Sequence, residues 1–173
     1  MKRDITFELD MFYHLYNRGV NRGLIYFDDE NYLFFIRNIK RYLLPVMDIV
    51  AYCLMPTHYH LLIFVTEGCD YTFSPNDSVD TKRKISPATQ AIQKFSISYT
   101  KAINKRYDRV GPLFQGPYRA KNISTISHSK RIIPYIHENP VHAGLVNTAT
   151  DWIYSSSKVY EGMEEPGFLT PLI

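Results

Sequence analysis

Met55-Pro-Thr-His-Tyr-His-Leu-Leu-Ile-Phe-Val65 is the stretch on which the predicted fold depends. Pro56 and Thr57 break the preceding apolar run, and the alternating residues that follow predict a β-strand. Because side chains two apart in a strand point to the same face, His58 and His60 are expected to project side by side. Two neighbouring imidazoles can bind one divalent cation, but they are also common as half-buried histidines of an ordinary sheet. The pair alone leaves both interpretations open.

Length and composition predict a single domain over residues 1–173, large enough to bury a core. No apolar run approaches the roughly 18 residues of a membrane span, and the N-terminus lacks the apolar segment of a signal peptide. Cys53 and Cys69 fall in no metal or disulfide spacing. We therefore expect a soluble cytoplasmic protein with no membrane partner.

Basic residues concentrate in one segment of the chain. The segment from Lys94 to Arg131 holds nine basic residues and one acid, Asp108, so it carries +8 in a chain whose net charge is +3. Such a block predicts a surface that binds a polyanion, with a solvated helix face as the equally weighted alternative.

The pattern of apolar residues and breakers predicts four strands and three helices. The strands are expected at 12–17, 47–54, the His-x-His stretch and 118–123. A first helix should begin at the carboxylates of Asp28-Asp29-Glu30, continue through Leu43 and stop before Pro45. A second should span 87–107 with Ser86 as N-cap. A third helix, N-capped by Ser127, should end at Asn139-Pro140.

This order of elements predicts an α+β fold of the ferredoxin-like type. An antiparallel four-stranded sheet would carry two helices on one face, with an additional helix carrying Tyr135. The composition predicts a mobile surface loop over about 67–86 and a C-terminal extension over about 147–173.

Tyr135 and Asn139 are four residues apart and should share a face of the third helix. If that helix packs beside the His-x-His strand, a hydroxyl and an amide reach a cation held by His58 and His60. Such a site supports attack of Tyr135 on a phosphorus atom polarised by the cation. Pro134 is unfavourable inside this helix, because an interior proline costs about 3 kcal/mol.

With these residues the chain resembles the HUH-type single-tyrosine transposases, particularly the REP-associated tyrosine transposase group. His58-Tyr59-His60 matches the pattern of two histidines around a large apolar residue, although a tyrosine stands in the middle. The similarity extends over most of the chain, through Tyr13-His-Leu-Tyr-Asn-Arg-Gly19, Gly111-Pro-Leu-Phe-Gln-Gly116, Tyr135-Ile-His-Glu-Asn-Pro-Val141, Ala143-Gly-Leu-Val146 and the tail from Trp152 to Ser157.

The resemblance implies a ferredoxin-like fold, Mg²⁺ or Mn²⁺ as cofactor, and single-stranded DNA with hairpin or palindromic ends as substrate. Tyr135 matches the nucleophile that forms a 5′-phosphotyrosine link. His58 and His60 match the metal ligands, and Asn139 matches the position of a third, amide-type ligand. Both a monomer and a homodimer that exchanges the tyrosine helix are compatible with the resemblance. Pro134, directly before the nucleophile, departs from the family pattern.

Further assignments rest on weaker signals. Tyr99 and Tyr107 are rival nucleophiles on the preceding helix, Tyr118 is a candidate for base stacking, His14 is expected to be structural, and His137 should point away from the site. Candidates for DNA contact are Arg18, Arg22, Lys105, Arg106, Arg119 and Lys121.

Two alternative functions fit parts of this pattern. A non-catalytic module that binds single-stranded nucleic acid through sheet aromatics would explain the basic block but not the histidine and tyrosine motifs. A replication-initiator or relaxase-type nickase would share the histidine pair and the tyrosine. The short chain, and the order of histidines before tyrosine, favour the transposase.

Overall fold

A four-stranded sheet forms the centre of the protein, whose computed structural model describes residues 6–67 and 86–172. The strand order is β2-β3-β1-β4, and each neighbouring pair is antiparallel. The predicted α+β architecture is therefore confirmed. Most of the loop expected at 67–86, with Cys69, lies outside the described residues. The strands are β1 (Phe12–Arg18), β2 (Met47–Met55), β3 (His58–Val65) and β4 (Arg119–Ile123).

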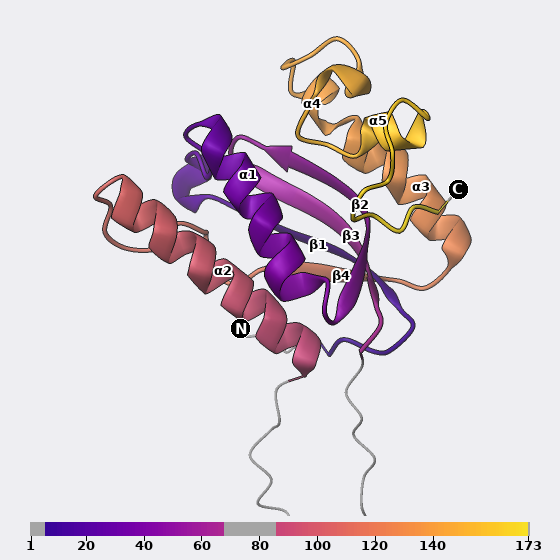
Figure 1. Cartoon of the computed structure of the whole chain (residues 1–173), viewed down its shortest axis with the longest axis horizontal. Helices are drawn as coiled ribbons and strands as arrows, with labels where there is room; N and C mark the ends of the chain where they lie inside the picture. Colours follow the sequence, from indigo (N-terminus) through magenta and orange to yellow (C-terminus); the bar gives the residue numbers. More distant parts are fainter. Residues whose placement is uncertain (1–5, 68–85, 173) are drawn as a thin grey trace, which may run out of the picture.

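Helices α1 (Asp29–Asn38) and α2 (Pro87–Arg106) lie together over one face of the sheet (Figure 1). They bury Phe35, Phe95 and Tyr99 against strand residues such as Leu15 and Leu61. The Asp28 carboxylate caps α1, and the predicted Ser86 cap of α2 accepts a hydrogen bond from the Thr89 N–H. After α1 the chain makes a π-helical turn, Ile39–Leu43, before Pro45 ends the helical path. No described helix is both long and apolar enough to cross a membrane.

Helix α3 (Ile126–His137) packs on the other face, where it contacts β2, β3 and β4. Ile133 and Ile136 are buried there with Val50 and Leu62. Because Leu62 shares its face with the other even-numbered residues of β3, the two histidines of β3 also lie on the α3 side of the sheet.

The start of α3 differs from the prediction. Thr125, not Ser127, is the N-cap: its backbone is extended and its hydroxyl accepts from the His128 N–H, while Ser127 already lies inside the helix. The helix also continues through Pro134 to His137. Pro134 is exposed, so water can reach the carbonyl that lacks its helical N–H partner.

The C-terminal segment fastens the end of α3 to the edge of β2. It contains α4 (Asn139–His142), the 3-10 turn Ala149–Asp151 and α5 (Ser157–Tyr160). The indole Nε1 of Trp152 donates to the Leu54 carbonyl at 3.0 Å, and the Leu54 N–H donates to the Tyr154 carbonyl at 2.9 Å. These bonds satisfy backbone groups of an edge strand that would otherwise be unpaired.

Two glycine-containing loops meet at the end of β1. The Gly19 N–H donates to the Thr57 carbonyl at 2.8 Å, and the Gln115 N–H donates to the Arg18 carbonyl at 2.8 Å. A Cβ at Gly19 would overlap the carbonyl oxygen of Gly23, so this close approach requires glycine. The contacts place both loops beside the turn that leads into His58.

Candidate active site

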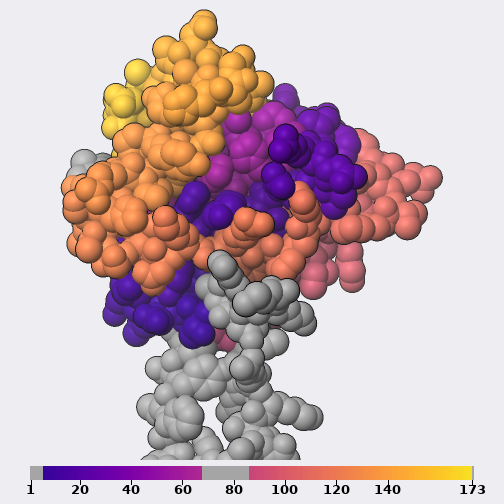
Figure 2. Space-filling model, turned by 180° about the vertical axis from the view of Figure 1, so that it is seen from behind, coloured from indigo at the N-terminus to yellow at the C-terminus, as the bar shows by residue number. Residues whose placement is uncertain are grey.

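His58 and His60 lie side by side at the start of β3, as their spacing predicts. Their ring centroids are 5.0 Å apart and their planes are nearly perpendicular. His60 is buried and His58 is half-buried. Figure 2 views the molecule from the side opposite to Figure 1, with α3 in orange and indigo atoms of the N-terminal strand at the surface beside it.

Each histidine has its Nδ1 atom in a hydrogen bond. His58 Nδ1 lies 3.0 Å from the Thr57 hydroxyl, and His60 Nδ1 lies 2.9 Å from Nε2 of His14. Within the described part of the chain, neither His58 nor His60 has a hydrogen bond at Nε2. The two Nε2 atoms therefore remain available as ligands.

Burial keeps all three imidazoles neutral near pH 7. Desolvation lowers the pKa of His60, with smaller contributions from His14 and His58. Desolvation, followed by the nearby Lys121 charge, lowers the pKa of His14. The pKa of His58 is lowered by its burial and then by Arg18. A neutral imidazole carries a lone pair, which is the form that binds a metal ion.

Tyr135 on α3 lies over this histidine cluster. Its ring centroid is 6.1 Å from that of His60 and 6.1 Å from that of His14, in edge-on geometry in both cases. The tyrosine is 52% exposed, so its hydroxyl is accessible to a substrate. Burial of Ile133 and Ile136 orients α3 so that the intervening Tyr135 reaches the open part of the site.

The rival tyrosines of α2 lie on the opposite side of the sheet. The hydroxyl of Tyr99 is buried and donates to the Ile25 carbonyl at 2.7 Å. The hydroxyl of Tyr107 donates to the Asp28 carboxylate at 2.7 Å. Neither is positioned to act with His58 and His60.

The Asn139 side chain is held at the end of α3, four residues beyond Tyr135. Its amide nitrogen donates to the backbone carbonyls of Tyr135, at 2.7 Å, and Ile136, at 3.2 Å, so the side chain closes the end of α3. No group of three His, Cys, Asp or Glu side chains in the described residues is arranged to hold a metal ion. The Nε2 atoms of His58 and His60 are therefore the candidate nitrogen ligands, and the amide oxygen of Asn139, which makes no hydrogen bond among the described residues, stays a candidate third ligand.

Three of the predicted DNA-contact residues share the face of the histidines. Arg18 pairs with His58 across β1 and β3, and its Nε donates to the Gln115 side-chain oxygen at 2.6 Å. Arg119 pairs with Tyr16 and Lys121 with His14 across β1 and β4. All three basic residues are exposed. They make this strand surface positively charged.

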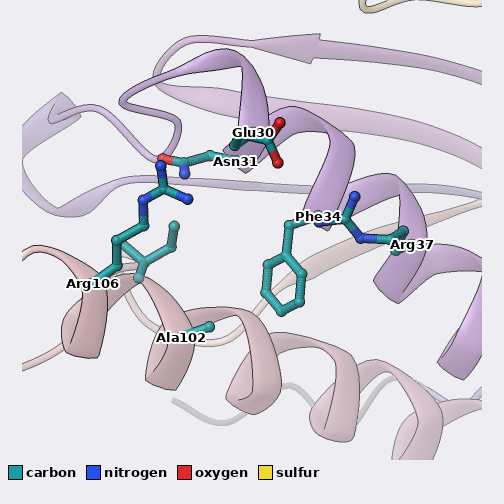
Figure 3. A pocket seen from close by; sticks show the side chains of 7 residues that line it. Glu30, Asn31, Phe34, Arg37, Ala102 and Arg106 are labelled. Carbon is teal, nitrogen blue, oxygen red and sulfur yellow. The ribbon is translucent and has the colours of Figure 1, made fainter.

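The other three predicted contacts lie elsewhere. Arg22 is exposed in the 3-10 turn Val20–Arg22, in the loop after β1. Lys105 and Arg106 are on α2, which covers the opposite face. Arg106 forms a 2.7 Å salt bridge with Asp28. Figure 3 shows Arg106 at the end of a shallow groove of about 180 Å³ between α1 and α2, on the side of the sheet away from the histidines.

His14, Tyr16 and Gln115 complete the neighbourhood of the site, although sequence reasoning did not assign them to it. Tyr16 is half-buried, and its ring centroid is 4.9 Å from that of His14. Alternation along β1 places His14, Tyr16 and Arg18 on one face. The sequence shows this alternation. It does not show that β1 pairs with β3, which is what brings His14 and Tyr16 beside His60. His137, expected outside the site, lies 2.8 Å from the Ser156 hydroxyl.

No family model and no curated protein matches the sequence. The structure aligns with a REP-associated tyrosine transposase bound to a REP hairpin, with a TM-score of 0.64 over 95% of this chain and 87% of that one. It has the fold of that transposase. The two sequences are 17% identical, and the shared fold agrees with the resemblance of the motifs.

A second solved structure, a presumed transposase from Deinococcus radiodurans R1, aligns less well. It is 15% identical, covers 80% of this chain and 97% of its own, and has a TM-score of 0.43.

Proposed function

We propose that this protein is a single-tyrosine transposase that cleaves and rejoins single-stranded DNA at hairpin-bearing ends. The observation that carries the proposal is the position of Tyr135, whose accessible phenol lies over the neutral His60 and His14 rings in the same chain. The family resemblance and the shared fold support the substrate class. The exposed Arg18, Arg119 and Lys121 supply positive charge beside the histidines for the phosphates of a DNA strand.

The histidine pair can supply two nitrogen ligands to a divalent cation, for which the family resemblance implies Mg²⁺ or Mn²⁺. Both Nδ1 atoms are already hydrogen-bonded, both rings are neutral, and His58 and His60 present Nε2 from adjacent positions on one face. A bound cation supplies Lewis-acid polarisation of the scissile phosphate. Both hydrogen bonds of the Asn139 side chain are donated by its amide nitrogen, so its amide oxygen is free of a hydrogen bond among the described residues and could add a third ligand.

The proposed chemistry conserves the phosphodiester bond energy. The Tyr135 hydroxyl attacks phosphorus, the bond from phosphorus to the 3′-oxygen breaks, and the DNA 5′-phosphate becomes linked to the tyrosine. The phenolic proton passes to solvent, and the departing 3′-oxygen takes up a proton. In the reverse direction a 3′-hydroxyl attacks the phosphotyrosine and restores the free tyrosine, so no external energy source is needed.

A denaturing gel with two labels tests this chemistry. A single-stranded hairpin oligonucleotide is incubated with the protein in Mg²⁺, Mn²⁺ or EDTA. A 3′ label should become covalently attached to the protein, whereas a 5′ label should appear on a shortened free strand, and both changes should require metal. Tyr135→Phe should abolish the adduct and Tyr16→Phe should retain it, which makes Tyr16, the other tyrosine whose ring lies beside His60, the matched control. Tight binding without any adduct would favour the non-catalytic binding module.

The location of Tyr135 also predicts that one chain supplies the whole site. The tyrosine and the histidines meet within one protomer, so a monomer acting in cis is sufficient. Mixing Tyr135→Phe with a His58→Ala/His60→Ala double variant should therefore give no adduct. Recovery of activity in the mixture would indicate a homodimer in which tyrosine helices are exchanged.

A further inference from the structure

His14 is a buried side chain that the proposed chemistry leaves without a role. It comes from β1, where its direct partner across the sheet is Leu62, and it reaches diagonally to His60. The hydrogen bond between His14 Nε2 and His60 Nδ1 is 2.9 Å long, and the two rings are stacked with centroids 5.0 Å apart. Tyr16 packs against the His14 ring and helps to fix its orientation.

We infer that His14 is a positioning residue that holds His60 in the tautomer with its proton on Nδ1 and its lone pair on Nε2. The assignment rests on the proposed function, because only a cation at His60 makes this tautomer matter. His14 would not itself be a ligand of the cation, because its Nε2 is bonded to His60 Nδ1. It acts by accepting the Nδ1 proton of His60 in a hydrogen bond.

Proton counting leaves two arrangements for a hydrogen-bonded pair of neutral imidazoles. In one, His60 Nδ1–H donates to His14 Nε2, so that Nε2 of His60 is unprotonated and can bind a metal. In the other, His14 Nε2–H donates to His60 Nδ1, and the proton of His60 then occupies its Nε2. Only the first arrangement leaves Nε2 of His60 free to bind a metal. The direction of the hydrogen bond therefore decides whether His60 can be a ligand.

The second histidine shows the same organisation. His58 Nδ1 lies 3.0 Å from the Thr57 hydroxyl, which can accept its proton and leave Nε2 unprotonated. The Nδ1 atom of each histidine therefore has a hydrogen-bond partner: His14 of β1 for His60, and Thr57 of the preceding turn for His58. Metal-binding histidines commonly have one ring nitrogen in a hydrogen bond, which orients the other nitrogen toward the metal. The Nδ1 bonds of both histidines match this pattern and leave the two Nε2 atoms for one cation.

The test combines tautomer assignment with metal affinity in the full chain. Long-range ¹H–¹⁵N NMR spectra of the metal-free protein should show His60 protonated at Nδ1. His14→Leu removes the acceptor and should weaken Mn²⁺ binding, measured by calorimetry, by about 10- to 100-fold. His14→Gln places an amide oxygen near the former Nε2 and should restore most of the affinity. His137→Leu, which changes another buried histidine on the same side of the sheet, should leave Mn²⁺ affinity unchanged.

The outcomes separate this role of His14 from the proposed function. A wild-type His60 protonated at Nε2, or a folded His14→Leu variant with wild-type Mn²⁺ affinity, would overturn the role of His14. If His14→Leu does not fold, the wild-type NMR spectrum and the His14→Gln affinity still decide the question. A wild-type protein with the Nδ1 tautomer but no Mn²⁺ binding would contradict the metal site and leave the hydrogen-bond direction intact.

Discussion

Acid is expected to destabilise the protein through His137, at the end of the helix that carries Tyr135. The ring is 6% exposed, and its Nε2 lies 2.8 Å from the Ser156 hydroxyl. Burial lowers the pKa of His137 from 6.5 to about 4. Between these two pKa values, His137 binds a proton in the unfolded chain but stays neutral in the folded chain. The stability contributed by the neutral ring is present above pH 6.5 and is lost as the pH falls toward 4.

The size of this effect follows from proton linkage. At pH 5 the histidine of the unfolded chain is almost fully protonated, whereas a folded histidine with a pKa of about 4 is mostly neutral. Lowering the pH from 7 to 5 should therefore remove about 2 kcal/mol of unfolding free energy through this one residue. His14 and His60 add destabilisation of the same sign, because burial lowers the pKa of both.

Urea denaturation of the wild type and His137→Gln at pH 7 and pH 5 isolates this contribution. Glutamine can keep an amide group near the Ser156 hydroxyl but does not titrate. The effects of His14 and His60 are common to both proteins and cancel in the comparison. The stability of the variant relative to the wild type should improve by about 2 kcal/mol between pH 7 and pH 5. A difference that stays constant across this range would show that burial does not lower the pKa of His137.

Three further substitutions test other parts of the structure. Gly19→Ala should lower the unfolding free energy by about 1–3 kcal/mol in urea titrations, because the new Cβ meets the Gly23 carbonyl; an unchanged midpoint would refute this close approach. Trp152→Phe should cost about 1 kcal/mol by removing the indole hydrogen bond to β2, and wild-type stability would mean that the bond contributes nothing. Arg18→Gln should reduce the salt dependence of single-stranded DNA affinity by a slope of about 0.7, whereas Arg106→Gln should not. Equal slopes for the two variants would contradict a DNA path beside the histidines.

Local patterns predicted the framework of the site. Alternation placed His58 and His60 on one face, and helical spacing placed Asn139 within reach of Tyr135. The antiparallel four-stranded sheet was also predicted, because the order of strands and helices along the chain admits few compact arrangements. Such features depend on neighbours in the chain, which a sequence displays directly.

Features that depend on distant residues could not be predicted. The hydrogen bond between His14 and His60 joins positions 46 residues apart. It could be predicted only if the register in which β1 pairs with β3 were already known. Arg106 lay within the basic block, yet its partner Asp28 is 78 residues away, at the N-cap of another helix. Thr125 and Ser127 are both good caps, and the backbone at the start of α3 decides between them. Long-range pairing and local backbone geometry therefore set the limits of prediction.

Peptide mapping of the covalent DNA adduct is the most direct test of the proposed mechanism. The adduct would be formed with a hairpin-bearing single strand in Mn²⁺, digested with nuclease and protease, and analysed by tandem mass spectrometry. Our structure predicts a 5′-linked nucleotide on the peptide that contains Tyr135, because that phenol is accessible beside His60. A nucleotide on Tyr16 or on any other residue, or no modified peptide at all, would contradict Tyr135 as the nucleophile.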